Sequence, residues 1–152
     1  KRQVFLEQAI AFVGSPASGW QRIDLPGSGR FARAAAVTCD PQACTIVGRE
    51  DDQLIVWRVD GSGTARRLTM PSLHVSERDR LAPPLLRDGR ALLVLDDHRN
   101  PGATVMLSEL GGGFALGQGP PGPVAGLASM GSTVLVLTGP ADPMPRIWSL
   151  QL

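Results

Sequence analysis

Short apolar runs recur along the chain, and turn-forming residues separate them. Two clear examples are residues 91–95 and residues 133–137. A run of about five residues suits a β-strand, because a helix needs about ten to twelve residues. These runs are continuous and do not alternate with polar positions. The strands are therefore predicted to be buried on both faces.

A longer pattern also repeats. Ile10 matches Ile55 and Pro26 matches Pro71 at an offset of 45 residues without a gap. The copies cover residues 10–26, 55–71 and 104–120, with a half-copy at 146–150. Each copy consists of an apolar strand, a turn of small residues, a second strand and an exit marked by Pro, which is typical of hairpins.

A second kind of hairpin is predicted between the copies. These hairpins cover residues 34–48, 84–95 and 124–137. Together the two hairpins form a unit of four antiparallel strands that recurs every 40–50 residues or so, a period typical of β-propeller blades. We therefore predict one all-β repeat domain over residues 1–152, with units 27–70, 71–119 and 120–152 and a partial unit 1–26.

At this level the chain resembles the blades of WD-repeat, kelch and sialidase-type propellers. The third strand of the unit carries a Trp, as in residues 54–58 and 146–149, and residues 37–48 look like secreted sialidase-type repeats. The resemblance implies a propeller-like fold and no activity, because the Trp-Asp dipeptide and the sialidase Asp-box are absent. The alternative is a β-sandwich, which about seven or more short strands also suit.

The strand count leaves a ring incomplete. About thirteen strands make roughly three blades, whereas closed propellers usually have about four to eight. The chain is therefore expected to be a partial propeller that continues in a longer protein, or one that two or more copies complete by joining into one ring. The start at Lys1 also favours a processed or excised chain. A helix over residues 2–13 is the other way to explain the count.

Charge and hydropathy exclude two classes of partner. The net charge is +1, so no broad basic surface for nucleic acid is expected. No apolar run reaches the roughly 18–20 residues of a membrane-spanning helix. No cofactor or metal is predicted, since the chain has two Cys residues and a zinc site takes about four ligands.

Cys39 and Cys44 flank a four-residue turn, where opposed strand positions can meet disulfide geometry. We predict a disulfide that stabilises the fold by less than about 3 kcal/mol, because the closed loop is short. A disulfide implies export, so the predicted location is extracellular or the cell envelope. Two buried thiols in a reducing compartment are the alternative.

Polar residues that follow the strands supply the candidate binding site. In a propeller-like fold, the loops after the second and fourth strands of each unit share one face, and loops on a rigid scaffold commonly bind ligands. The candidates on that face are His74, Arg78, Asp97, His98 and Arg99.

The predicted function is a non-enzymatic binding or scaffold domain that contacts a protein or glycan partner through its loop faces. The rest of a longer propeller and further copies of the chain in a homo-oligomer are the other predicted partners. The alternative is a hydrolase fragment centred on Asp97 and His98, which could act as acid and base. Adjacent strand residues point in opposite directions, which weighs against that pair.

Overall fold

The computed structural model describes residues 7–27, 31–77, 79, 81–97, 99–100, 102–139 and 146–151. The regular secondary structure of these residues consists of thirteen β-strands in antiparallel sheets, which confirms the predicted all-β class. The alternative of a helix over residues 2–13 is wrong where it can be examined, because Ile10–Ser15 is a strand.

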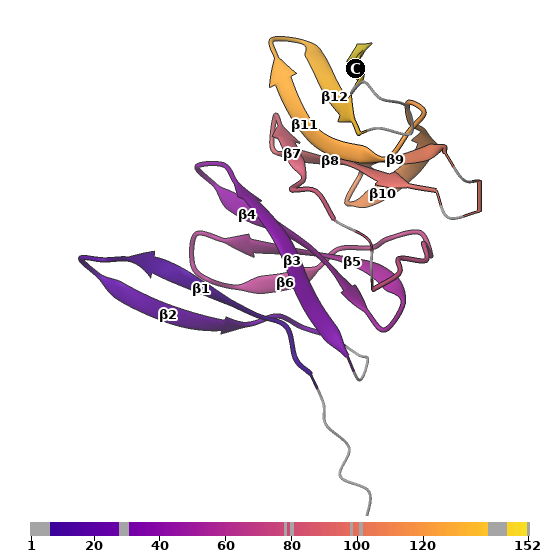
Figure 1. Ribbon diagram of the computed structural model, residues 1–152. Coiled ribbons are helices and arrows are strands. Elements are labelled where there is room, and N and C mark those ends of the chain that lie inside the picture. The colour runs from indigo at the N-terminus through magenta and orange to yellow at the C-terminus, as the bar shows by residue number, and fades with distance from the viewer. Residues whose placement is uncertain are drawn as a thin grey trace, which may run out of the picture.

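Four sheets follow one another along the chain (Figure 1). The first sheet contains β1 (Ile10–Ser15) and β2 (Gly19–Asp24). The second contains β3 (Ala32–Cys39), β4 (Ala43–Glu50), β5 (Gln53–Asp60) and β6 (Ala65–Arg67). The third contains β7 (Leu85–Arg87), β8 (Arg90–Asp96), β9 (Thr104–Leu110) and β10 (Gly113–Gln118). The fourth contains β11 (Val124–Met130), β12 (Thr133–Thr138) and β13 (Arg146–Gln151).

Each sheet is a meander, in which strands that are consecutive along the chain are hydrogen-bonded neighbours. Tight turns make this possible. In the β7–β8 turn, Asp88 and Gly89 have φ angles of 49° and 70°, the left-handed conformation that two-residue hairpin turns require. The sequence Asp-Gly is favoured at these two positions for that reason.

The second sheet is buried on both faces, as its continuous apolar runs predict. Ile55 and Trp57 pack with Ile23 of the first sheet, and all three are at most 6% exposed. Val56 points to the other face, where it joins a cluster that includes Leu93 of the third sheet. Alternate residues of one strand thus contact two different neighbouring sheets.

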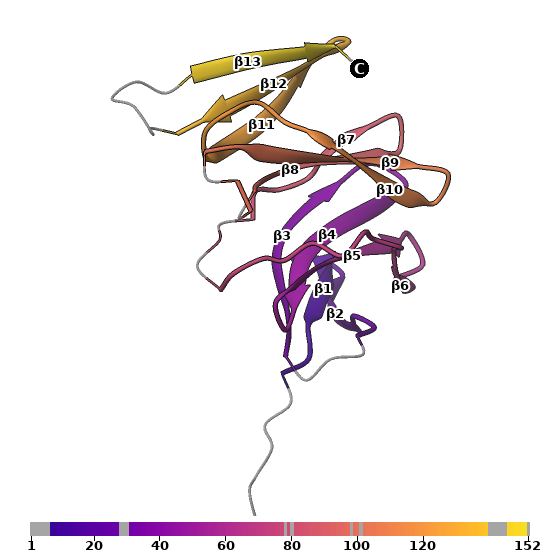
Figure 2. The ribbon, with the colours of Figure 1, turned by 90° about the vertical axis from the view of Figure 1, so that its right-hand side faces the viewer.

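The third sheet repeats this arrangement. Leu93 faces the second sheet, whereas Leu92 and Val94 pack with Val134 and Val136 of the fourth sheet. The sheets therefore form a stack of four layers, which Figure 2 shows from the side. A β-sandwich has two layers, so the sandwich alternative is wrong.

Gly48 in β4 allows Trp57 to lie close to the backbone. A Cβ atom at residue 48 would lie 2.8 Å from Cζ3 of Trp57 and 2.1 Å from the carbonyl oxygen of Arg33. The Trp57 indole N–H donates to the carbonyl oxygen of Pro26 at 2.6 Å. A residue without a side chain is required at position 48 because real Cβ atoms do not approach so closely.

The repeat offset corresponds to equivalent places in successive sheets. Ile10 lies in β1 and Ile55 in β5, and each of these strands begins the hairpin that ends its sheet. The second, third and fourth sheets fall within residues 27–70, 71–119 and 120–152 respectively. The described sheets form an open stack. The division into folding units and the closure of the stack into a propeller stay predictions.

Candidate binding rim

The connections after β4, β6, β8 and β10 form the candidate site, and we call them the rim. Because strands of a meander alternate in direction, the connections after β4 and β6 leave one end of the second sheet, and those after β8 and β10 leave one end of the third. Figure 1 shows the connection after β8 at the right of the view, opposite the β1–β2 and β11–β12 turns at the left.

The connection after β6 is fixed to the second sheet by main-chain hydrogen bonds. The Leu54 N–H donates to the Leu73 carbonyl oxygen at 2.9 Å, and the Val75 N–H donates to the Asp52 carbonyl oxygen at 2.8 Å. Val75 is 3% exposed and belongs to the core between the second and third sheets. An apolar anchor and two hydrogen bonds therefore hold this long connection in place.

His74 lies between these two hydrogen bonds and faces solvent. Its Nδ1 lies 3.2 Å from Oδ2 of Asp52, and the two side chains are 51% and 63% exposed. The Gln53 side-chain amide donates to the other Asp52 oxygen and lowers the pKa of that carboxyl group, and His74 lowers it further. The predicted residue His74 is thus half of an exposed acid–imidazole pair, and no sequence pattern indicates its partner Asp52.

The same connection has a second attachment at Arg49 of β4. Its Nη1 donates to the Ser76 carbonyl oxygen at 3.2 Å, and its Nη2 lies 3.6 Å from Oε1 of Glu77. The Arg49 side chain is only 13% exposed, whereas that of Glu77 is 84% exposed. Arg78, the next predicted site residue, lies outside the described residues.

Asp97 organises the connection after β8. Its Oδ1 accepts the Arg99 N–H at 3.0 Å, and its main-chain N–H donates to the Ala103 carbonyl oxygen at 2.9 Å. This is an Asx turn, in which a short carboxylate replaces part of a backbone turn. Arg99 is exposed, and His98 lies outside the described residues.

Two further bonds join the third and fourth sheets at the rim. Oδ1 of Asp96 accepts the Val124 N–H at 3.0 Å, and the Gly122 N–H donates to the Gly102 carbonyl oxygen at 2.8 Å. The structure thus places His74 on the second sheet and Asp97 and Arg99 on the third, at adjacent ends of neighbouring sheets. Their convergence on one ligand stays a prediction.

Cys39 and Cys44 form a disulfide across the β3–β4 turn, as predicted. Oδ1 of Asp40 accepts the N–H groups of Ala43 and Gln42, both at 2.8 Å, inside the same turn. These two backbone hydrogen bonds lower the pKa of Asp40. The disulfide indicates an oxidising compartment.

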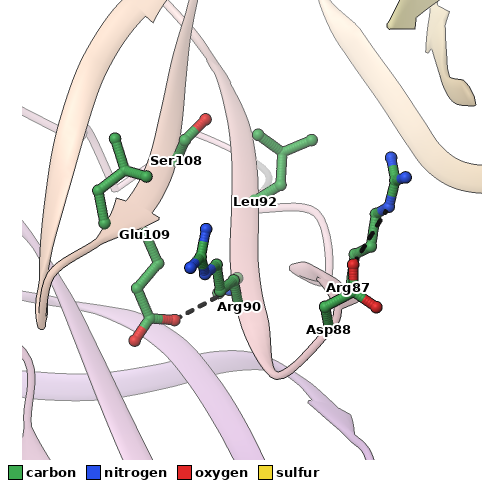
Figure 3. A pocket seen from close by; sticks show the side chains of 8 residues that line it. Arg87, Asp88, Arg90, Leu92, Ser108 and Glu109 are labelled. Atoms are coloured by element: carbon green, nitrogen blue, oxygen red, sulfur yellow. Dashed lines mark hydrogen bonds and ion pairs between the residues drawn. The ribbon is translucent and has the colours of Figure 1, made fainter. Parts of the chain in front are cut away.

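The opposite end of the third sheet carries a cavity of about 600 Å³ that no sequence motif indicates (Figure 3). Its lining includes Arg87, Arg90, Ser108 and Glu109. The carboxylate of Glu109 is already occupied by protein donors, one of which is the Ala91 N–H at 2.9 Å. The sequence signal was only an Arg-Asp-Gly-Arg turn, which indicates a hairpin rather than a cavity.

The tryptophans do not form a sugar-stacking set. Trp57 is fully buried, and Trp148 packs in the cluster between the third and fourth sheets. Trp20 is 64% exposed, but it lies in β2 of the first sheet and not on the rim. Trp57 and Trp148 therefore pack between neighbouring sheets.

The chain matches no model of a known protein family and no curated protein. Within the described residues, no group of three or more His, Cys, Asp and Glu side chains is arranged to hold a metal ion. No helix in that part of the chain is long and apolar enough to cross a bilayer. Function is therefore inferred from the geometry of the rim and the stack.

Proposed function

We propose that this chain is a non-enzymatic binding module that contacts a protein partner through the rim. One observation carries the proposal: the connection after β6 is anchored at Leu54, Val75 and Arg49, yet it presents His74 to solvent. A polar side chain held on a rigid connection loses little conformational freedom when it binds, which favours affinity.

A protein partner is favoured over a glycan. Sugar sites commonly use several exposed aromatic rings as stacking surfaces, and none of Trp20, Trp57 and Trp148 lies on the rim. Phe31, which is 47% exposed and whose carbonyl oxygen accepts the Asp51 N–H, is a single exposed ring beside the rim. The rim instead presents mixed charges, including Asp52, Glu77 and Arg99, that suit the polar periphery of a protein interface.

The role of Asp97 supports binding rather than hydrolysis. One of its carboxylate oxygens accepts a main-chain N–H of its own turn, so the side chain shapes the loop. A general acid or base needs its carboxylate directed at a substrate.

The arrangement of the sheets and the disulfide extend the proposal. A stack of meanders, each packed face to face on the next, is how propeller blades are arranged, so we place the module in a propeller-like protein. The Cys39–Cys44 disulfide supports an extracellular or cell-envelope location, since structural disulfides persist in oxidising compartments.

Site-specific photo-crosslinking tests the proposal. A photoreactive residue replaces His74 or Arg99 on the rim, and Ser132 in the β11–β12 turn is the matched exposed control. With the secreted proteins of the source organism, both rim positions are expected to give one common adduct that resists glycosidases. Alanine at His74 or Arg99 is expected to weaken binding of that purified partner roughly 5- to 30-fold, as for interface residues worth about 1–2 kcal/mol.

Three outcomes would contradict a protein-binding rim. The first is an adduct from the control position alone, and the second is no adduct at any position. The third is an adduct that glycosidases remove completely, because that result identifies a glycan as the bound partner.

A further inference from the structure

The first sheet exposes an apolar outer face. Phe12 and Trp20 are 58% and 64% exposed, and Ile10 is 37% exposed. Phe12 pairs with Arg22, and Trp20 pairs with Gly14, so their side chains lie on the same face of the hairpin. The opposite face carries Ile23, which is buried against the second sheet.

The fourth sheet exposes a second apolar face at the other end of the stack. Met130 and Ile147 are 67% and 71% exposed, and Leu137 is 38% exposed. A shallow depression of about 260 Å³ lies on this face, with a lining that includes Leu135, Leu137 and Ile147. The lining residues are all apolar or Gly: Gly126, Leu127, Ala128, Leu135, Leu137 and Ile147.

The two exposed faces are of complementary kinds. We call the face of a sheet that points toward the next sheet along the chain its forward face, and the face that points toward the previous sheet its backward face. Inside the stack, the forward face of one sheet packs on the backward face of the next, as Val56 does on Leu93 and Val94 on Val136. The outer face of the fourth sheet is a forward face, and the outer face of the first sheet is a backward face. Within the part of the chain that the structure describes, no sheet packs on either of them.

Two equivalent positions of the sequence repeat show the same difference between a covered and an exposed backward face. At the offset of 45, Phe12 corresponds to Trp57, and both point backward along the stack. Trp57 is 0% exposed because the first sheet covers it, whereas Phe12 is 58% exposed. Phe12 therefore occupies a position that is covered in the following repeat.

We propose that a second copy of this chain covers both faces. The fourth sheet of each copy packs on the first sheet of the other, so that two identical head-to-tail interfaces close one ring. Two copies supply eight sheets, of which four are four-stranded, two three-stranded and two two-stranded; counted as sheets, they lie within the usual range of about four to eight blades for closed propellers. Arg22 and Asp24, on the outer face of the first sheet, form an ion pair at 2.9 Å, so no unbalanced charge there opposes association.

Sedimentation and native mass spectrometry test this assembly. The wild-type chain is expected to have twice its monomer mass of 16.1 kDa. Phe12→Glu blocks one face and Ile147→Glu blocks the other, and each variant alone is expected to be monomeric. Their mixture is expected to form a heterodimer, because each variant retains the face that the other lacks. Leu116→Glu is the control, since Leu116 is 56% exposed but lies in β10 of the third sheet.

The decisive result is whether the two variants form a heterodimer when they are mixed, measured at chain concentrations of about 1 µM and about 100 µM. A wild-type monomer at the higher concentration overturns the proposal, as does an open polymer. A single variant that remains dimeric overturns it too, because such a dimer joins two identical faces. Circular dichroism and the urea midpoint of each variant establish that it is folded, and both substituted residues are exposed in the single chain. Binding at the rim is a separate measurement, so failure of one proposal leaves the other intact.

Discussion

An ion pair between Arg58 in β5 and Glu109 in β9 connects the second and third sheets, and its removal gives the sharpest test of the stack. The Arg58 Nη2 lies 2.7 Å from Oε2 of Glu109, and the two side chains are 15% and 8% exposed. The same Glu109 oxygen accepts the Ala91 N–H at 2.9 Å. The perturbation is Glu109→Leu, which removes the carboxylate and keeps an apolar side chain of similar size.

The expected loss in the free energy of unfolding follows from the groups that lose their partner in Glu109→Leu. The Arg58 guanidinium stays charged and largely buried, and its Nε already lacks a hydrogen-bond partner among the described residues. The Ala91 N–H also loses its acceptor, which alone costs about 1–3 kcal/mol. Breaking a buried pair from one side typically costs about 3–5 kcal/mol. We expect a loss of about 3 kcal/mol in the free energy of unfolding.

Replacing both partners should cost much less than replacing one. In the double variant Arg58→Met with Glu109→Leu no buried charge remains, so the expected loss is about 1 kcal/mol. The double-mutant cycle then gives a coupling of about 2 kcal/mol or more. Asp88→Asn is the control, because the Asp88 side chain is 90% exposed and its ion pair with Arg87 is long, at 3.8 Å.

The assay is urea unfolding followed by circular dichroism, with the slope compared between variants. A loss of 3 kcal/mol also lowers the melting temperature by roughly 6–12 °C in a chain of this size. A loss below about 1 kcal/mol for Glu109→Leu, or costs that simply add in the double variant, would refute the packing of the second sheet on the third through this pair.

Three further predictions concern other parts of the fold. Trp57→Ala is expected to lower stability by about 3–5 kcal/mol in urea unfolding; Phe12→Ala, at the equivalent repeat position, should cost under about 1 kcal/mol when measured in the monomeric Ile147→Glu background. Reduction of Cys39–Cys44 is expected to cost about 2 kcal/mol without unfolding the chain, and thiol labelling before and after reduction should count zero and two free thiols. Because the folded-state pKa of Asp40 is lowered, its contribution to stability is present above the unfolded pKa of about 3.9 and is lost as the pH falls through the folded value. Asp40→Asn should reduce the fall in stability at acid pH, measured by urea unfolding over a range of pH or by NMR titration. A fall in stability equal to that of the wild type would contradict the role given to Asp40.

The strands were predictable because they depend on local pattern, and so was the two-sided burial of the strands inside the stack. The same prediction is wrong for residues 133–137, because no described sheet covers the outer face of the fourth sheet and Leu137 is 38% exposed there. Residues 91–95 form one continuous apolar run, and every one of them is at most 4% exposed. A strand places successive side chains on opposite faces, so a run without polar positions has no face for solvent. The disulfide was predictable for a similar reason, since Cys39 and Cys44 flank one short turn.

The rim was predictable only in part. Sequence alone could indicate that His74, Asp97 and Arg99 follow strands, because apolar runs end before them. It could not indicate that His74 pairs with Asp52, 22 residues earlier. That contact exists because the connection after β6 folds back onto the turn after β4. The spacing of apolar residues within one strand cannot predict such a long-range contact.

Taken by itself, the sequence determined which positions are apolar, where most of the strands lie and how often the hairpins recur, since these depend on spacing within a few residues. The tertiary structure alone decided which sheet covers which. Phe12 and Trp57 occupy the same place in the repeat, yet one is exposed and the other fully buried. The physical reason is that burial depends on the neighbour a face meets, and only the second of these two faces has a sheet packed against it.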